Sequence, residues 1–240
     1  TGLDVSIITL TGSNLTGAVF TNANFIGANL SGTNITNAVF TGANFSNMTT
    51  GALIGATTAT LPTGYVVRGT GAPGSYIVGP GVFLRNANLT NADLTNISIA
   101  SCDVSGVIFT GANVTGLSSL GIINAANIVA LPSASYVIRN NFIVGPGVNL
   151  SGANLSDQIF IGLTVADANF TGANLNYSTF TNTTVTNANF TGATFTSTIC
   201  GGGLIGLASA TLPSAAYVAR TATYNVFLGP GVITRNLNFT

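Results

Sequence analysis

A large apolar residue recurs at every fifth position between Asn22 and Phe45, and this spacing constrains the fold more than any other feature. A small residue stands two positions before each large one, as Ala23 stands before Phe25. An α-helix repeats its apolar face about every 3.6 residues and a β-strand every 2, so neither explains this period. The period therefore indicates a solenoid built from short similar units.

The same period occupies three blocks of the chain. Asn or Asp usually precedes the large residue, Thr or Ser follows it, and Gly or Asn often comes next. The large positions are Val5, Leu10, Leu15, Phe20, Phe25, Leu30, Ile35, Phe40 and Phe45, then Leu84, Leu89, Leu94, Ile99, Val104, Phe109 and Val114, then Leu150, Leu155, Phe160, Val165, Phe170, Leu175, Phe180, Val185, Phe190 and Phe195. Because every one of them is apolar, the repeat pattern is not a chance match.

This pattern resembles the pentapeptide-repeat family, whose motif is A-(D/N)-L-x-x. The resemblance implies an all-β fold, a right-handed quadrilateral parallel β-helix, in which each unit makes one side and four units close a coil. A single coil cannot bury its apolar residues, so stacked coils should share one continuous core. Outward Asn and Thr should then recur every 20 residues in side-chain ladders.

Three similar connectors interrupt the repeat, and each predicts a β-hairpin. They begin with Leu-Pro at Leu61, Leu131 and Leu212, and each ends in Gly-Pro-Gly-Val. We expect one solenoid over 1–240, with repeat blocks 1–50, 82–116, 148–200 and 232–240 and connectors 51–81, 117–147 and 201–231. Arg68, Arg139 and Arg220 share one connector position, which favours a role in hairpin packing or subunit contacts.

The composition argues against an enzyme. The five basic residues are all Arg, and with no His or Lys the usual catalytic bases and a common metal ligand are missing. Asp93 and Asp103 are ten residues apart, as are Asp157 and Asp167, which places each pair on opposite sides of a coil. We therefore predict no catalytic, cofactor-binding or metal-binding residues and no cofactor, and we assign Cys102 and Cys200 to the core.

The charge balance argues against nucleic acid as a partner. Five Arg offset five Asp, and charged residues make up 4% of the chain. Such a chain lacks the basic surface that nucleic-acid binding requires. It also lacks the strongly acidic surface of the DNA-mimicking topoisomerase inhibitors known in the resembled family. No apolar run is long enough for a transmembrane helix.

An almost uncharged surface favours contact with copies of the same chain, or glycans that keep it soluble. Triplets such as Asn29-Leu30-Ser31 and Asn154-Leu155-Ser156 would be glycan acceptors only in a glycosylating export pathway. The chain begins with Thr, which suits either processing after export or a trimmed sequence. We expect an extracellular location.

Neither end shows the polar cap that a solitary solenoid requires, so the leading hypothesis is a structural subunit that stacks head to tail into an open filament or sheath. The residues predicted to form this assembly interface are Val5, Ile7, Leu10, Val232, Ile233, Leu237 and Phe239. Two alternatives stay open. One is a piece of a longer repeat protein, and the other is an ice- or surface-binding array using Thr16, Thr21, Thr36 and Thr41.

Overall fold

The structure is a computed structural model that describes residues 2–69, 74–201, 203–220 and 226–234. The chain divides into two compact units, Thr1–Ser133 and Ala134–Thr240, where the sequence predicted a single solenoid. In a solenoid each coil contacts only its neighbours, so the contacts within a chain can separate into such units. Each unit is described by itself.

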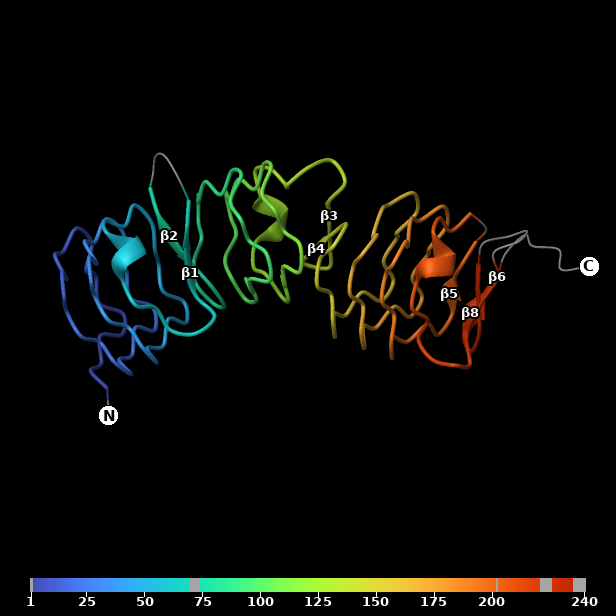
Figure 1. Ribbon diagram of the computed structural model, residues 1–240, viewed down its shortest axis with the longest axis horizontal. Helices are drawn as coiled ribbons and strands as arrows, with labels where there is room; N and C mark the ends of the chain where they lie inside the picture. The colour runs from blue at the N-terminus through green and yellow to red at the C-terminus, as the bar shows by residue number, and fades with distance from the viewer. Residues whose placement is uncertain (1, 70–73, 202, 221–225, 235–240) are drawn as a thin grey trace, which may run out of the picture. The chain divides into compact units, whose positions relative to one another are not determined.

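Both units consist of four-sided coils stacked in parallel (Figure 1). Each side pairs with the side 20 residues along the chain, and Asn24, for example, forms parallel bridges with both Asp4 and Asn44. The bridges are single residues because the chain turns after each side. The predicted right-handed quadrilateral parallel β-helix is confirmed.

The corners explain why Gly and Asn recur in the repeat. Each corner is a turn closed by a backbone hydrogen bond, such as Ala23 N to Phe20 O at 3.0 Å. The third residue of the turn has a positive φ, as type II turns require, with 57° at Asn22 and 68° at Gly27. Gly and Asn adopt this conformation at the lowest cost.

The large residues of the repeat fill the interior of each unit. Phe25, Phe40 and Phe45 are all 0% exposed. In the second unit the rings of Phe160 and Phe180 stack with centroids 4.3 Å apart and an interplanar angle of 7°. This continuous apolar column is the main source of stability, because each coil buries the apolar face of the next.

Outward Asn side chains stabilise the coils in two ways. The Oδ1 atom of Asn34 accepts a bond from the backbone N–H of Thr36 at 3.0 Å, which braces the adjacent corner. Between coils, Asn174 Nδ2 donates to Asn154 Oδ1 at 3.0 Å. A similar bond joins Asn169 to Asn149 in the same unit, so the predicted polar ladders are confirmed.

The coil path continues beyond the block ends predicted from sequence. Ile54 bridges to Asn34 and Ala130 to Ile108, although both lie in predicted connectors. Short 3-10 helices occupy these stretches: η1 (Ala56–Thr58), η2 (Ala125–Asn127) and η3 (Leu207–Ser209). Each takes up the one or two extra residues before the chain leaves the coil, as the pairing of Val39 with Thr60 shows.

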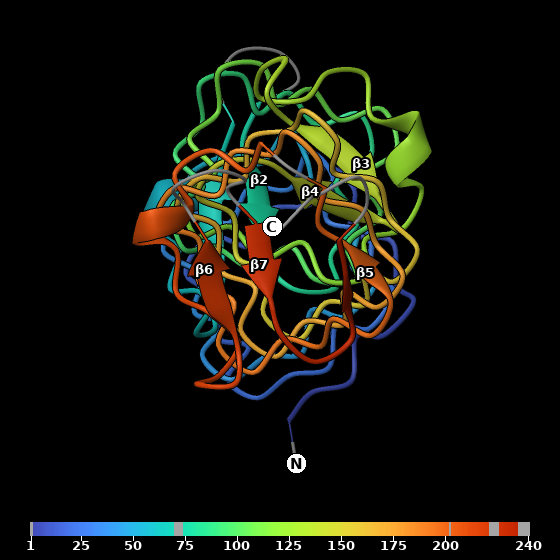
Figure 2. The same cartoon turned by 90° about the vertical axis from the view of Figure 1, so that its right-hand side faces the viewer.

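The predicted hairpins form at the Leu-Pro to Gly-Pro-Gly segments. The strands pair antiparallel as β1 (Val66–Arg68) with β2 (Tyr76–Val78), β3 (Val137–Arg139) with β4 (Phe142–Val144), and β6 (Val218–Arg220) with β7 (Val226–Leu228). After the third hairpin, β8 (Val232–Ile233) returns to the coil and pairs in parallel with β5 (Thr198–Ile199). Figure 2 shows β6 and β7 side by side at this end of the second unit.

Candidate functional site

One backbone edge of the first coil has no partner among the described residues. In the second coil, Asn24 N donates to Leu3 O at 2.8 Å and Asn24 O accepts from Val5 N at 2.9 Å. The residue before each large position thus pairs its N–H and C=O with the preceding coil. The equivalent residues of the first coil have the same orientation, so their backbone N–H and C=O groups point away from the second coil. Among the described residues, none of these groups has a hydrogen-bond partner on that side. These counterparts are Asp4, Thr9, Asn14 and Val19.

Apolar side chains are exposed around this edge. Leu10 and Leu15 are half-buried, whereas Leu30 and Ile35, which occupy the same positions one coil later, are 0% exposed. Of the six residues of this surface, the sequence analysis identified Ile7 and Leu10 and missed the other four. The first-coil surface, as we define it, comprises the exposed residues Leu3, Ile7, Ile8 and Val19 with the half-buried Leu10 and Leu15.

Ile7 is the most exposed large apolar residue of this surface, at 83%. It stands at a corner with a φ of 52°, where most other corners have Gly or Asn. A β-branched residue at positive φ is a conformational outlier that costs about 1–2 kcal/mol. Ile7 is thus both strained and exposed, and neither property stabilises the isolated coil.

The structure places the other predicted interface residues as follows. Val5 is buried, at 8% exposed, so it belongs to the core more than to a surface. Val232 is half-buried and Ile233 is 37% exposed. Leu237 and Phe239 lie outside the described residues.

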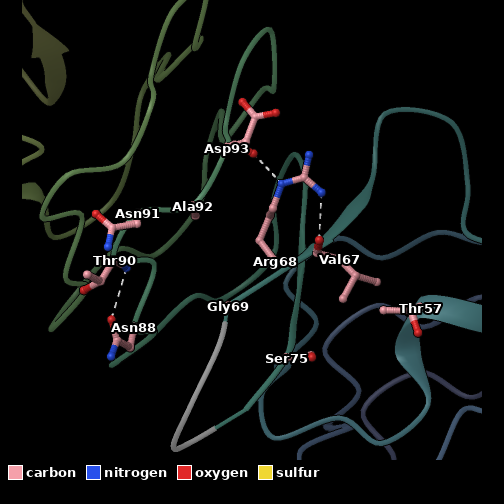
Figure 3. A pocket seen from close by; sticks show the side chains of 10 residues that line it. All are labelled: Thr57, Val67, Arg68, Gly69, Ser75, Asn88, Thr90, Asn91, Ala92 and Asp93. Atoms are coloured by element: carbon pink, nitrogen blue, oxygen red, sulfur yellow. Dashed lines mark hydrogen bonds between the residues drawn. The ribbon is translucent and has the colours of Figure 1, made fainter.

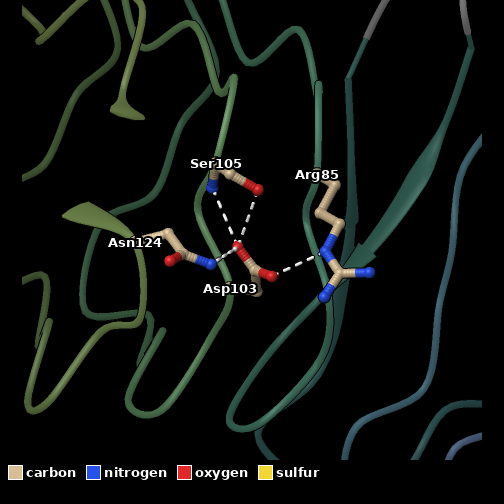
Figure 4. A network of polar contacts seen from close by, with 4 residues as sticks. All are labelled: Arg85, Asp103, Ser105 and Asn124. Atoms are coloured by element: carbon tan, nitrogen blue, oxygen red, sulfur yellow. Dashed lines mark hydrogen bonds and ion pairs between the residues drawn. The ribbon is translucent and has the colours of Figure 1, made fainter. Parts of the chain in front are cut away.

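Asp103 forms the centre of a polar network in the first unit (Figure 4). Its Oδ1 atom accepts bonds from Ser105 N at 3.0 Å and from Asn124 Nδ2 at 3.0 Å, while Oδ2 pairs with Arg85 Nε at 2.6 Å. The guanidinium of Arg85 also lies 4.5 Å from the ring centroid of Phe83. Asp103 thus occupies the position that Asn has in most repeats, and it joins two coils through an ion pair that the sequence analysis missed.

Ionised Asp103 stabilises the fold, and this stabilisation should be lost in acid. Burial raises the pKa of the carboxyl, but hydrogen bonds from Asn124, Ser105 and Arg85 outweigh it and lower the pKa from 3.8 to about 2. The stabilisation is full above the unfolded pKa of 3.8 and disappears as the pH falls through the folded value of about 2. At about 1.4 kcal/mol per pKa unit, we expect a loss of about 2 kcal/mol.

Urea unfolding between pH 5 and pH 2 measures this loss, with Asp103→Asn as the control. The variant should lose less stability over this range, because its amide does not titrate. Equal pH dependence of the two proteins would contradict the assignment.

A cavity of about 770 Å³ lies between the first hairpin and the coil that follows it (Figure 3). Arg68 lies at its centre, where Nε donates to the carbonyl oxygen of Asp93 and Nη1 donates to Val67 O at 2.8 Å. Both contacts are to backbone carbonyls, so Arg68 fastens the hairpin to the coil. This confirms hairpin packing as a role for the connector Arg.

Both cysteines lie in the interior, as predicted. Burial raises the pKa of the Cys102 and Cys200 thiols to about 12, so neither is a nucleophile at neutral pH. No cluster of three or more Asp or Cys residues that could hold a metal ion occurs in the described ranges. Within the same ranges, no helix has the length and apolar character needed to cross a membrane.

These coils, with one large inward residue per five-residue side, define a quadrilateral β-solenoid. The profile of the pentapeptide repeats (8 copies) matches residues 9–42, 81–116, 148–186 and 173–202. The chain therefore belongs to the pentapeptide repeat family.

The chain is also similar to several solved structures, at low sequence identity and low TM-score. HetL, a pentapeptide repeat protein involved in heterocyst differentiation regulation from the cyanobacterium Nostoc sp. strain PCC 7120, is 18% identical over 88% of this chain and 87% of its own, with a TM-score of 0.35. Full-length QnrB1, a plasmid-mediated fluoroquinolone resistance protein, is 20% identical over 98% of this chain and 92% of its own, with a TM-score of 0.22. A pentapeptide repeat protein from the Arabidopsis thaliana thylakoid lumen is 18% identical over 79% of this chain and 62% of its own, with a TM-score of 0.17. No curated protein matches the sequence.

Proposed function

We propose that this chain is a non-catalytic structural subunit that assembles head to tail, with its first-coil surface docked on a second copy. The observation that supports this most directly is the exposure of Ile7, Ile8 and Val19 on a coil edge that has no partner among the described residues. An exposed strand edge with apolar neighbours is a template for pairing with another chain. A contact between unlike surfaces that does not close on itself builds a filament.

The conformation of Ile7 supports the same proposal. Asn in its place would adopt the positive φ at lower cost and would suit an exposed corner. Backbone strain held at an exposed position favours a functional contact, because the isolated chain gains nothing from it. Burial of this side chain by a second copy would offset the strain.

Ile7→Asn should therefore separate folding from assembly. We expect the free energy of unfolding of the monomer to rise by about 1 kcal/mol, since the strain at this corner is relieved. Self-association should weaken at the same time, because the most exposed apolar group of the first-coil surface is removed. Urea unfolding measures the first effect and sedimentation velocity over a range of concentrations the second.

Ile123→Asn serves as the matched control, because Ile123 is 45% exposed and lies outside the first-coil surface. It should leave the distribution of sedimenting species unchanged. Wild-type protein that stays monomeric at high concentration, or an Ile7→Asn variant that assembles like the wild type, would overturn the proposal.

A further inference from the structure

The cavity beside the first hairpin is not required to fasten that hairpin to the coil. In the first unit the Nε of Arg68 donates to Asp93 O. In the second unit the Nε of Arg139 makes the equivalent bond, to Ile159 O at 3.0 Å. Both acceptors stand immediately before a large position of the repeat. The two hairpins are thus fastened alike, and their surroundings can be compared position by position.

In the second unit two amide side chains lie against the coil next to this bond. Asn140, the residue after the Arg, donates from Nδ2 to Asn154 O at 2.8 Å. Gln158, the residue before the acceptor, donates from Nε2 to Ser156 O at 3.1 Å. Both side chains therefore occupy space between the second hairpin and its coil.

Two small residues stand at these positions in the first unit. They are Gly69 and Ala92, and both line the cavity (Figure 3). A Cβ atom on Gly69 would lie 3.4 Å from Asn88 O, which is the counterpart of the carbonyl that Asn140 binds. Gly69 faces this carbonyl but has no side chain that could donate to it. The cavity of about 770 Å³ thus lies where the second unit has the side chains of Asn140 and Gln158.

Uncharged polar groups from both sides line the cavity. Thr57 in η1 contributes a hydroxyl from one side, and Asn88, Thr90 and Asn91 contribute two amides and a hydroxyl from the facing coil (Figure 3). Asn88 Oδ1 accepts a bond from Thr90 N at 3.1 Å, which leaves the Nδ2 hydrogens as donors. Within the described ranges neither Thr hydroxyl forms a hydrogen bond, so both can bind a ligand.

The two charged residues of the lining offset each other. Arg68 uses Nε and Nη1 to bind backbone carbonyls, so Nη2 remains a donor. Asp93 Oδ1 accepts bonds from the backbone N–H and the hydroxyl of Thr95, at 3.1 and 2.6 Å, so Oδ2 remains an acceptor. One guanidinium and one carboxylate leave no excess charge to attract an anion or a cation. The cavity therefore suits a neutral ligand with many hydrogen-bonding groups.

We propose that this cavity binds a neutral monosaccharide or disaccharide. A sugar hydroxyl both donates and accepts, so it can pair with the Thr hydroxyls, the Asn amides and the two charged groups. Val67 and Ala92 also line the cavity and supply apolar surface for the C–H face of a sugar ring. Pockets for small ligands have volumes of roughly 300–1,000 Å³, and this cavity lies in that range. The site shares no residue with the first-coil surface, so the proposal does not depend on head-to-tail assembly.

Ala92→Gln tests the site by giving the first unit the side chain that Gln158 provides in the second. Because the repeat already accepts Gln at this position, the variant should fold, which circular dichroism checks. Saturation-transfer difference NMR titrations with glucose, N-acetylglucosamine and maltose measure binding. The wild type should bind at least one of these probes, and the variant should bind it more weakly by about tenfold or more, since Gln takes up the space. Ala92→Ser keeps a small side chain and should bind like the wild type.

Asn91→Gly tests the same site without filling it. Asn91 and Asn96 stand at successive corners of one coil, each with a φ of 56°, and Asn96 is not part of the lining. Gly occupies many corners of the repeat, so both Asn91→Gly and the control Asn96→Gly keep the turn. Loss of one neutral hydrogen bond should weaken sugar binding by about fivefold in Asn91→Gly. Asn96→Gly should leave it unchanged.

The outcomes decide both the site and the class of ligand. Wild-type protein that binds none of the three sugars would overturn the proposal, as would equal binding by the wild type, Ala92→Gln and Asn91→Gly. Stronger binding of acetate or glycine than of the sugars would show that Arg68 or Asp93 selects a charged ligand, and would also overturn it. Weaker sugar binding in Ala92→Gln and Asn91→Gly, with Asn96→Gly unaffected, would establish the site. None of these variants should change self-association, so failure here leaves the proposed function untouched.

Discussion

Phe180→Ala should lower the free energy of unfolding by about 3–5 kcal/mol, which is the largest effect that we expect from a single substitution in this chain. The ring of Phe180 is 0% exposed and stacks on Phe160. It also lies 6.1 Å from Phe190 and 6.3 Å from Phe195, centroid to centroid. Truncation to Ala leaves a cavity inside the apolar column. Because backbone hydrogen bonds hold the coils on every side, the neighbouring side chains can fill this cavity only partly.

Phe180→Leu is the matched control. Leu fills the same position at Leu155 and Leu175 in the same block, where both are buried. The repeat therefore accepts this side chain, and we expect a cost of about 1 kcal/mol. Equilibrium unfolding in guanidinium chloride measures both variants. Equal losses for Ala and Leu would show that the ring stack, and not the filled volume, stabilises the column.

Gly145→Ala should have the second-largest effect, a loss of about 3 kcal/mol. A Cβ atom on Gly145 would lie 2.3 Å from Cδ1 of Tyr136, so the ring would have to move. Its displacement would break the bond from the Tyr136 hydroxyl to Pro146 O and expose apolar surface of the second hairpin. The same crowding would occur at Gly79 against Tyr65, which explains why every connector pairs a Tyr with Gly-Pro-Gly.

Two variants separate crowding from the other effects of this substitution. Gly152 has a φ of 68° with no atom within 4 Å of an added Cβ, so Gly152→Ala measures backbone strain alone, about 1 kcal/mol. Tyr136→Phe removes only the hydroxyl bond and should also cost about 1 kcal/mol. Thermal unfolding of the three proteins gives the comparison. A loss in Gly145→Ala no larger than that in Gly152→Ala would rule out steric crowding against Tyr136.

Much of the fold could be predicted because the repeat is local. Five residues contain one inward side chain and one corner, so the sequence period reports the coil directly, and residues such as Phe25 and Phe180 were assigned to the core correctly. The same register predicted the Asn ladders. It could also have located the ion pair of Arg85 with Asp103, since the two residues are 18 positions apart and so lie on adjacent coils.

The candidate site was only partly predictable from sequence. Ile7 and Leu10 were identified as interface residues, but Leu3, Ile8, Leu15 and Val19 were not, because a local repeat does not report how far each side chain is exposed.

The sequence by itself determined the repeat, its inward column and the positions of the three hairpins, because these depend on contacts within one side or between sides 20 residues apart. The tertiary structure alone decided how far the coil path runs into the connectors, where η1, η2 and η3 take up extra residues. It also decided how the first hairpin is fastened, since the bond from Arg68 to Asp93 O joins residues 25 positions apart. A local pattern encodes a coil, but only the stacked coils show which side chains become buried.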